Sequence, residues 1–198
     1  MSLQASESIR AHLSGLARAA DEAASDLADS ASRYAEMVHR TFLEGGRLLF
    51  AGNGGSAAAA EHMATEYVVR LRRERRALPA ISLTGNIPML SAAANDLGYE
   101  RVFARILEAH GRLGDLLVLH STSGNSANLL EVAATARNMG ITTVALLDRD
   151  GGELGSRVDL AIRVPATGSA RVQELQLAVE HAVADAVESR IVEDGSEA

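Results

Sequence analysis

Residues 47–56 read RLLFAGNGGS, an apolar run that passes directly into a glycine-rich turn and then into a helix-forming stretch. Short continuous apolar runs are typical of strands that are buried on both faces of a parallel sheet. We therefore expect a strand over residues 47–51 and a helix over residues 56–71. A strand, a tight turn and a helix in this order form the unit from which doubly wound α/β proteins are built.

The same alternation of strand and helix continues along the rest of the chain. Further strands are expected at residues 79–84, 115–120, 142–147 and 159–164, and further helices at 88–109, 125–139 and 169–192. Strands separated mostly by helices form a parallel sheet that is covered on both faces. The sequence thus predicts an α/β fold with a doubly wound, five-stranded parallel sheet in the flavodoxin-like order 2-1-3-4-5. Ligands bind such a sheet where the strand order reverses, at the carboxyl ends of the first and third strands.

The N-terminal part of the chain has a different periodicity. Residues 4–44 carry apolar side chains at three- and four-residue steps, which indicates helices. We expect two helices with a break between residues 25 and 30, forming an N-terminal helical extension over residues 1–44. No repeat or interdomain linker is visible, so residues 1–198 are expected to form a single domain. The polar tail over residues 193–198 is expected to be disordered.

The composition argues against several classes of function. The chain has 198 residues, a net charge of −7, an aromatic share of 3% and no cysteine. Such an acidic chain is not expected to bind nucleic acid, so the arginine-rich segment 70–76 is interpreted as solvated or subunit-contacting. The absence of cysteine excludes disulfides and thiolate metal sites. No apolar run is long enough for a membrane span, and the N-terminus lacks a signal-peptide pattern, so we expect a cytoplasmic location.

Two Ser/Gly-rich loops follow the first and third predicted strands, at residues 52–56 and 121–126. Glycines let the backbone approach an anion, hydroxyl groups add donors, and the helix that follows each loop directs free N–H groups at the ligand. Neither loop fits a nucleotide-binding signature. One such loop could be only a tight turn and helix N-cap. Two at the same predicted crevice favour a phosphate site.

His62 and Glu66 lie four residues apart on the helix that follows the first loop, and this spacing places both side chains on one face. Gln173 and His181 lie nearly in line on the last predicted helix. Two histidines and a carboxylate suit zinc or another divalent metal, and a glutamine oxygen can also coordinate. Spacing alone nevertheless favours an ordinary exposed pair for His62 and Glu66, and nothing in the sequence brings the two helices together.

At these residues the chain resembles the sugar isomerase (SIS) domain family, in its phosphoheptose isomerase branch. The resemblance extends from about residue 45 to residue 192. It rests on Gly52–Ser56, His62 with Glu66, Asn95–Tyr99, Ser121–Ser126, Asp150–Gly152, and Arg171–Glu174 followed by His181. Each segment alone is unspecific, and the combination is highly specific.

The resemblance implies conversion of sedoheptulose 7-phosphate to D-glycero-D-manno-heptose 7-phosphate through an enediol. It also implies a homotetramer with active sites between subunits and one zinc ion in each subunit. In this family, the positions that bind zinc or surround the reacting carbons correspond to His62, Glu66, Gln173 and His181.

Isomerisation needs a base that removes the proton next to the carbonyl and an acid near the two oxygens. We assign Glu66 as the base and His181 as its acid/base partner. The resemblance extends the expected substrate contacts to the two loops and their neighbours: Asn53, Gly54, Gly55, Ser56, Glu66, Asn95, Asp96, Ser121, Thr122, Ser123, Ser126 and Gln173.

Some segments depart from the family pattern and leave two alternatives open. The departures are residues 84–89, residues 167–170 and Gln176, a position where the family often has histidine. They bear on the exact sugar, so an isomerase of another sugar phosphate is one alternative. A non-catalytic SIS regulator that contacts a replication initiator is the other, although that branch lacks the counterparts of Glu66 and His181, both of which this chain has.

Overall fold

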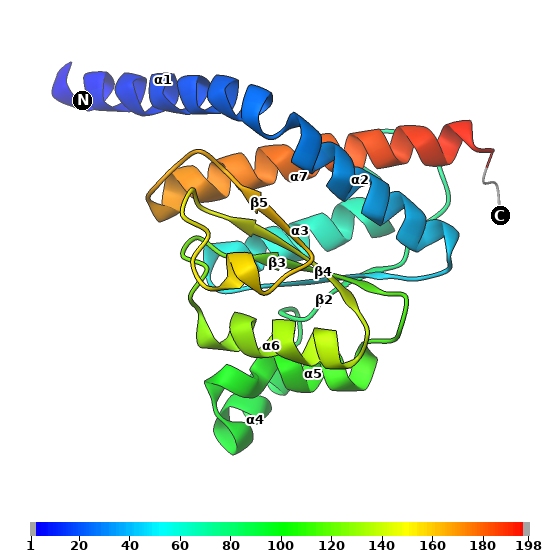
Figure 1. Cartoon of the computed structure of the whole chain (residues 1–198). Coiled ribbons are helices and arrows are strands. Elements are labelled where there is room, and N and C mark those ends of the chain that lie inside the picture. The colour runs from blue at the N-terminus through cyan, green and yellow to red at the C-terminus, as the bar shows by residue number, and fades with distance from the viewer. Residues whose placement is uncertain (1–2, 196–198) are drawn as a thin grey trace.

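The computed structural model describes residues 3–195, and its centre is a parallel sheet (Figure 1). The five strands are β1 (Leu48–Gly52), β2 (Ala80–Ser82), β3 (Leu116–His120), β4 (Thr142–Leu147) and β5 (Leu160–Arg163). They are ordered β2-β1-β3-β4-β5, and all neighbours are parallel. The predicted fold class and strand order are confirmed. The order reverses between β1 and β3, which places their carboxyl ends side by side.

Helices cover both faces of the sheet (Figure 1). One layer contains α2 (Ala28–Leu43), α3 (Gly55–Val68) and α7 (Ser169–Glu193), and the other contains α4 (Ile87–Leu97), α5 (Val102–His110) and α6 (Ala127–Asn138). Two single-turn 3-10 helices are also present. η1 (Tyr99–Arg101) lies between α4 and α5 in the sequence, and η2 (Leu154–Ser156) lies between β4 and β5. Side chains alternate along each strand, so Phe50 enters the core beneath the first layer and Leu49 the core beneath the second. Burial on both faces explains why the strands are continuously apolar.

The predicted N-terminal helices are present and differ in how they pack. Helix α1 (Leu3–Asp26) and helix α2 meet at Leu27, within the expected break. Helix α2 buries Tyr34, Val38 and Phe42 against the domain. Most of α1 is exposed, and its N-terminal half extends beyond the body of the domain (Figure 1). Its ion pair between His12 and Glu174, at 3.0 Å, joins it to the beginning of α7.

The C-terminal end of the described chain contacts α2. Helix α7 continues to Glu193, and the carboxylate of Asp194 lies 2.8 Å from Nε2 of the buried His39 on α2. The disordered tail expected over residues 193–198 stays a prediction beside this hydrogen bond. Residues 196–198 of that tail lie outside the described residues.

Helix α3 ends at Val68, three residues before the predicted end, because the next segment bonds to a different helix. The backbone N–H groups of residues 71–73 donate to the Glu188 carboxylate of α7 at 2.8–3.1 Å. Arg75 Nε lies 3.0 Å from the same carboxylate, and both side chains are buried. Burial raises the pKa of Glu188, but these backbone hydrogen bonds and the Arg75 charge outweigh it and lower the pKa overall. Part of the arginine-rich segment 70–76 thus packs against α7 of the same chain.

No helix within residues 3–195 is long and apolar enough to cross a membrane.

Candidate active site

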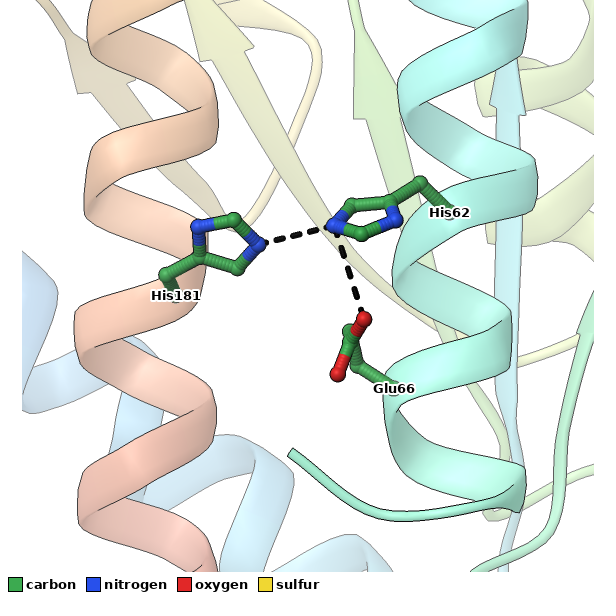
Figure 2. A group of neighbouring side chains, drawn as sticks. All are labelled: His62, Glu66 and His181. Carbon is green, nitrogen blue, oxygen red and sulfur yellow. Dashed lines mark hydrogen bonds and ion pairs between the residues drawn. The ribbon is translucent and has the colours of Figure 1, made fainter. Parts of the chain in front are cut away.

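Helices α3 and α7 bring three of the predicted site residues together, as Figure 2 shows. His62 Nε2 lies 2.8 Å from His181 Nε2 and 3.6 Å from a carboxylate oxygen of Glu66. One ligand atom from each residue lies within 4.8 Å of the others. Helix α3 supplies His62 and Glu66 from successive turns, and α7 supplies His181 from the facing side. The interpretation as an isolated exposed pair does not account for His181.

This group is open to solvent, with 43% of the His62 side chain and 17% of the Glu66 side chain exposed. Two imidazole nitrogens that face each other at 2.8 Å can share only one proton between them. At least one of the two nitrogens therefore presents a lone pair to the other. Two imidazoles and one carboxylate are the donor types of catalytic zinc sites, which keep a further position for water or substrate. The donor chemistry of His62, Glu66 and His181 therefore fits a divalent metal.

Gln173 lies at the first loop, two turns of α7 before His181. Its amide Nε2 is 3.5 Å from the hydroxyl of Ser56, and its oxygen occupies the place where a side chain at Gly55 would have to begin. A Cβ atom on Gly55 would come within 2.7 Å of that oxygen. Glycine at position 55 thus lets α7 approach the loop closely. A metal-ligand role for Gln173 stays a prediction.

Three helices of the described chain begin at this edge of the sheet without a side-chain cap. Their N-cap residues are Gly54 for α3, Ser126 for α6 and Gly168 for α7, and none of their side chains accepts a hydrogen bond from the helix. By contrast, Asn86 caps α4 through a bond from the Met89 N–H. Free N–H groups at helix N-termini attract anions. Gly54 and Ser126 belong to the predicted phosphate loops, so this geometry supports the phosphate interpretation.

The second loop is shaped by its own side chains and by the segment at residues 151–154. The buried hydroxyl of Ser121 accepts from the N–H of Gly124 at 3.0 Å, and the Gly124 carbonyl accepts from the N–H of Leu154 at 2.9 Å. Gly124 has a φ of +65°, and a Cβ atom there would lie 2.2 Å from the Gly151 carbonyl. Only glycine satisfies both conditions. Ser121 thus holds the loop's shape, and the outer residues Thr122 and Ser123 are more exposed.

The remaining predicted substrate contacts lie at the edge of this region. The Asn53 side chain bonds to Asn128 of α6 and to Tyr99 of η1. Asn95 and Asp96 are exposed on α4, where the Asn95 amide donates to the Asp96 carboxylate at 2.7 Å. The substrate contacts proposed for all three remain predictions.

The sequence did not predict a buried cluster of polar side chains, formed by Tyr34, His120 and Glu180 next to His181. The Tyr34 hydroxyl donates to Glu180 at 2.9 Å, and His120 Nε2 lies 3.4 Å from the other oxygen of the same carboxylate. Burial, followed by the charge of Glu180, raises the pKa of Tyr34. Gln176, the departure from the family's frequent histidine, is buried and donates to the carbonyls of Ser121 and Leu146. None of these residues has a sequence spacing that would mark it, because the contacts join distant elements.

Comparison with known proteins identifies the class to which this arrangement belongs. Residues 12–148 match the model of the SIS domain, and this match covers more than half of the chain, which therefore belongs to the SIS domain family. The phosphoheptose isomerase of Roseiflexus sp. (strain RS-1) is 50% identical over 160 residues, covering 81% of each chain. Within the SIS domain proteins, this chain belongs to the phosphoheptose isomerase family.

Solved structures agree with this assignment. Phosphoheptose isomerase GmhA from Neisseria gonorrhoeae superimposes with a TM-score of 0.87 at 36% identity, covering 95% of this chain and 100% of that one. A phosphoheptose isomerase from Francisella tularensis superimposes with a TM-score of 0.90 at 29% identity, covering 96% and 100%. Nearly the whole chain is therefore accounted for by this fold.

Proposed function

We propose that this protein is an aldose–ketose isomerase that converts sedoheptulose 7-phosphate to D-glycero-D-manno-heptose 7-phosphate. The observation that carries the proposal is the convergence of His62, Glu66 and His181 beside two phosphate-type loops. Family membership gives the reaction class, and the relatives at 50% identity are phosphoheptose isomerases.

The reaction moves a carbonyl from C2 to C1 and needs only proton transfers. Glu66 removes a proton from C1, which gives an enediol, and returns it to C2. His181 serves the two oxygens, giving a proton to O2 and accepting one from O1, so that the atoms balance. The partial burial of Glu66 and the position of His181 on the facing helix support these two roles.

We assign His62, Glu66, His181 and Gln173 to a metal site, with one zinc ion in each subunit. A divalent ion bound there would polarise the substrate carbonyl and stabilise the developing negative charge. The donor set supports this assignment for the first three residues. For Gln173, the support is its place on the same helix as His181 and its position against the first loop.

The phosphate of the substrate is proposed to bind where α3 and α6 begin. The donors are the backbone and hydroxyl groups of the predicted loop residues Gly54, Gly55, Ser56, Thr122, Ser123 and Ser126. Uncapped helix N-termini support this placement, since they supply positive potential without lysine or arginine.

We further propose a cytoplasmic homotetramer whose active sites lie between subunits. The side chains of Ile9 and Leu13 on α1 are 54% and 59% exposed, although both are apolar. A second copy that packs on α1 would cover them.

The two alternative functions are less well supported. A non-catalytic regulator would have no need for a convergent His62–Glu66–His181 group. An isomerase of another sugar phosphate would share the chemistry, and the phosphoheptose isomerase relatives favour the seven-carbon substrate.

The test is incubation of the zinc-supplemented protein with sedoheptulose 7-phosphate, followed by 13C NMR of the sugar carbons. We expect conversion to the aldoheptose phosphate by the wild type and its loss in Glu66→Gln and in His181→Ala. A folded wild-type protein that leaves sedoheptulose 7-phosphate unchanged would contradict the proposal. Conversion of a hexose or arabinose phosphate in the same assay would then identify the other substrate class.

A further inference from the structure

We propose that Asn128 is a positioning residue, and that its amide pair with Asn53 holds the two phosphate-type loops in a fixed relative position. The inference rests on the proposed function and assigns a role to two residues, Asn128 and Tyr99, that do not belong to the predicted site. It also gives Asn53 a structural role beside the substrate contact expected of it.

The amide groups of Asn53 and Asn128 bond to each other in both directions. Asn53 Nδ2 donates to Asn128 Oδ1 at 2.9 Å, and Asn128 Nδ2 donates to Asn53 Oδ1 at 2.8 Å. The Tyr99 hydroxyl donates to the same Asn53 oxygen at 3.0 Å. An amide oxygen has two acceptor sites, so Asn53 Oδ1 is fully used. The Asn53 oxygen therefore has no acceptor site left for a ligand, whereas Asn53 Nδ2 uses one of its two N–H groups on Asn128 and keeps the other.

The pair joins segments that are far apart in sequence but border the same crevice. Asn53 lies in the loop after β1, and Asn128 lies in the first turn of α6, two residues after Ser126 of the second loop. Tyr99 begins η1, directly after the segment that contains Asn95 and Asp96. One amide group thus connects three of the segments to which the predicted substrate contacts belong.

Burial makes this link specific. Asn128 is only 3% exposed, so breaking the pair leaves polar groups without water to replace their partners. Two parallel hydrogen bonds between planar amides also fix orientation, which a single bond or an apolar contact would not. The expected function is to keep the uncapped starts of α3 and α6 at the separation that one phosphate group requires.

The experiment compares Asn128→Ala with Val132→Ala as a matched control. Val132 lies one turn further along α6 and is fully buried, so its truncation weakens the same helix without touching either loop. Hydrogen exchange is measured on peptides that cover residues 52–58, and KM and kcat are measured with sedoheptulose 7-phosphate. We expect Asn128→Ala to raise exchange in the first loop and to raise KM about tenfold, with kcat within about twofold, because binding is lost equally in the ground and transition states. Val132→Ala should change neither.

A third variant keeps the test informative if Asn128→Ala folds poorly. Tyr99 is 59% exposed, so Tyr99→Phe removes one hydrogen bond with little effect on folding. It should raise KM about two- to threefold, a graded effect in the same direction. Unchanged exchange and KM in Asn128→Ala, or equal changes in Val132→Ala, would overturn the proposal. A wild-type protein that does not convert the sugar would instead contradict the proposed function, and the exchange measurement would still test the link between the loops.

Discussion

Glu180 and His181 are neighbours on α7, yet their side chains enter opposite environments. Consecutive side chains on a helix are rotated by about 100°, so one points into the core and the next toward α3. Glu180 is 1% exposed and bonds to Tyr34, whereas His181 meets His62 at the open surface (Figure 2). On the core-facing side of α7, Glu180 bonds to the buried Tyr34 of α2. On the site-facing side, His181 meets His62, and both side chains are accessible to a ligand.

From this comparison we expect substitutions at the site to lower kcat and substitutions on the core-facing side of α7 to lower the free energy of unfolding. The largest effect is expected for Glu66→Gln, opposite His181. We expect kcat to fall about 10³-fold, because an amide cannot act as the base. The free energy of unfolding should change by less than about 0.5 kcal/mol, since Glu66 is partly exposed and lies 3.6 Å from its partner. Sugar NMR and urea unfolding measure the two quantities, and a large loss of stability would remove the distinction between the two sides.

On the core-facing side, Glu180→Ala should do the reverse and mainly destabilise the protein. We expect a loss of about 3 kcal/mol in urea unfolding, because Tyr34 and His120 would keep buried polar groups without their partner. The matched control is the triple variant Tyr34→Phe, His120→Leu and Glu180→Leu, which replaces all three polar side chains by apolar side chains of similar size. It should recover most of the loss, and failure to recover would mean that these side chains do more than satisfy one another's hydrogen bonds.

Metal binding provides a third contrast. At a zinc concentration about 100 times the dissociation constant, we expect the wild type to gain about 2.7 kcal/mol of stability. His62→Ala should abolish this gain, whereas His12→Ala should retain it, because His12 pairs with Glu174 away from the site. Calorimetric unfolding with and without zinc measures the difference. Equal zinc stabilisation of all three proteins would place the ion elsewhere.

The smallest expected effect concerns Glu188, which lies further toward the C-terminus on α7. This effect on the free energy of unfolding depends on pH. Glu188→Gln should cost about 2 kcal/mol at pH 7, where the wild-type carboxylate is charged and bonded to residues 71–73. The pKa of Glu188 is lower in the folded protein than its ordinary value of 4.5. Its stabilisation is therefore present above pH 4.5 and is lost as the pH falls through the lowered pKa. The wild type and Glu188→Gln should converge in acid-titrated unfolding. A constant difference would show that the charge is not responsible.

Much of the fold could be predicted from the sequence because its signals are local. The apolar runs near Leu48 and Leu116 are long enough to indicate strands, and the glycine-rich turns that follow them indicate where helices begin. The end of α3 at Val68 could not be predicted, since it depends on Glu188, more than a hundred residues away in sequence. The contact of Asp194 with His39 likewise joins residues that are far apart in sequence.

For the site, the order of residues alone specifies which residue types lie on which helix. The spacing of His62 and Glu66 predicts that both lie on one face of α3, and the loops at residues 52–56 and 121–126 are predicted at one edge of the sheet. Contacts between distant elements bring His181 to His62, turn Glu180 away from it and pair Asn53 with Asn128. The reason is physical. Local periodicity fixes the direction of a side chain about its own helix, whereas the packing of distant helices on a sheet fixes which side chains it meets.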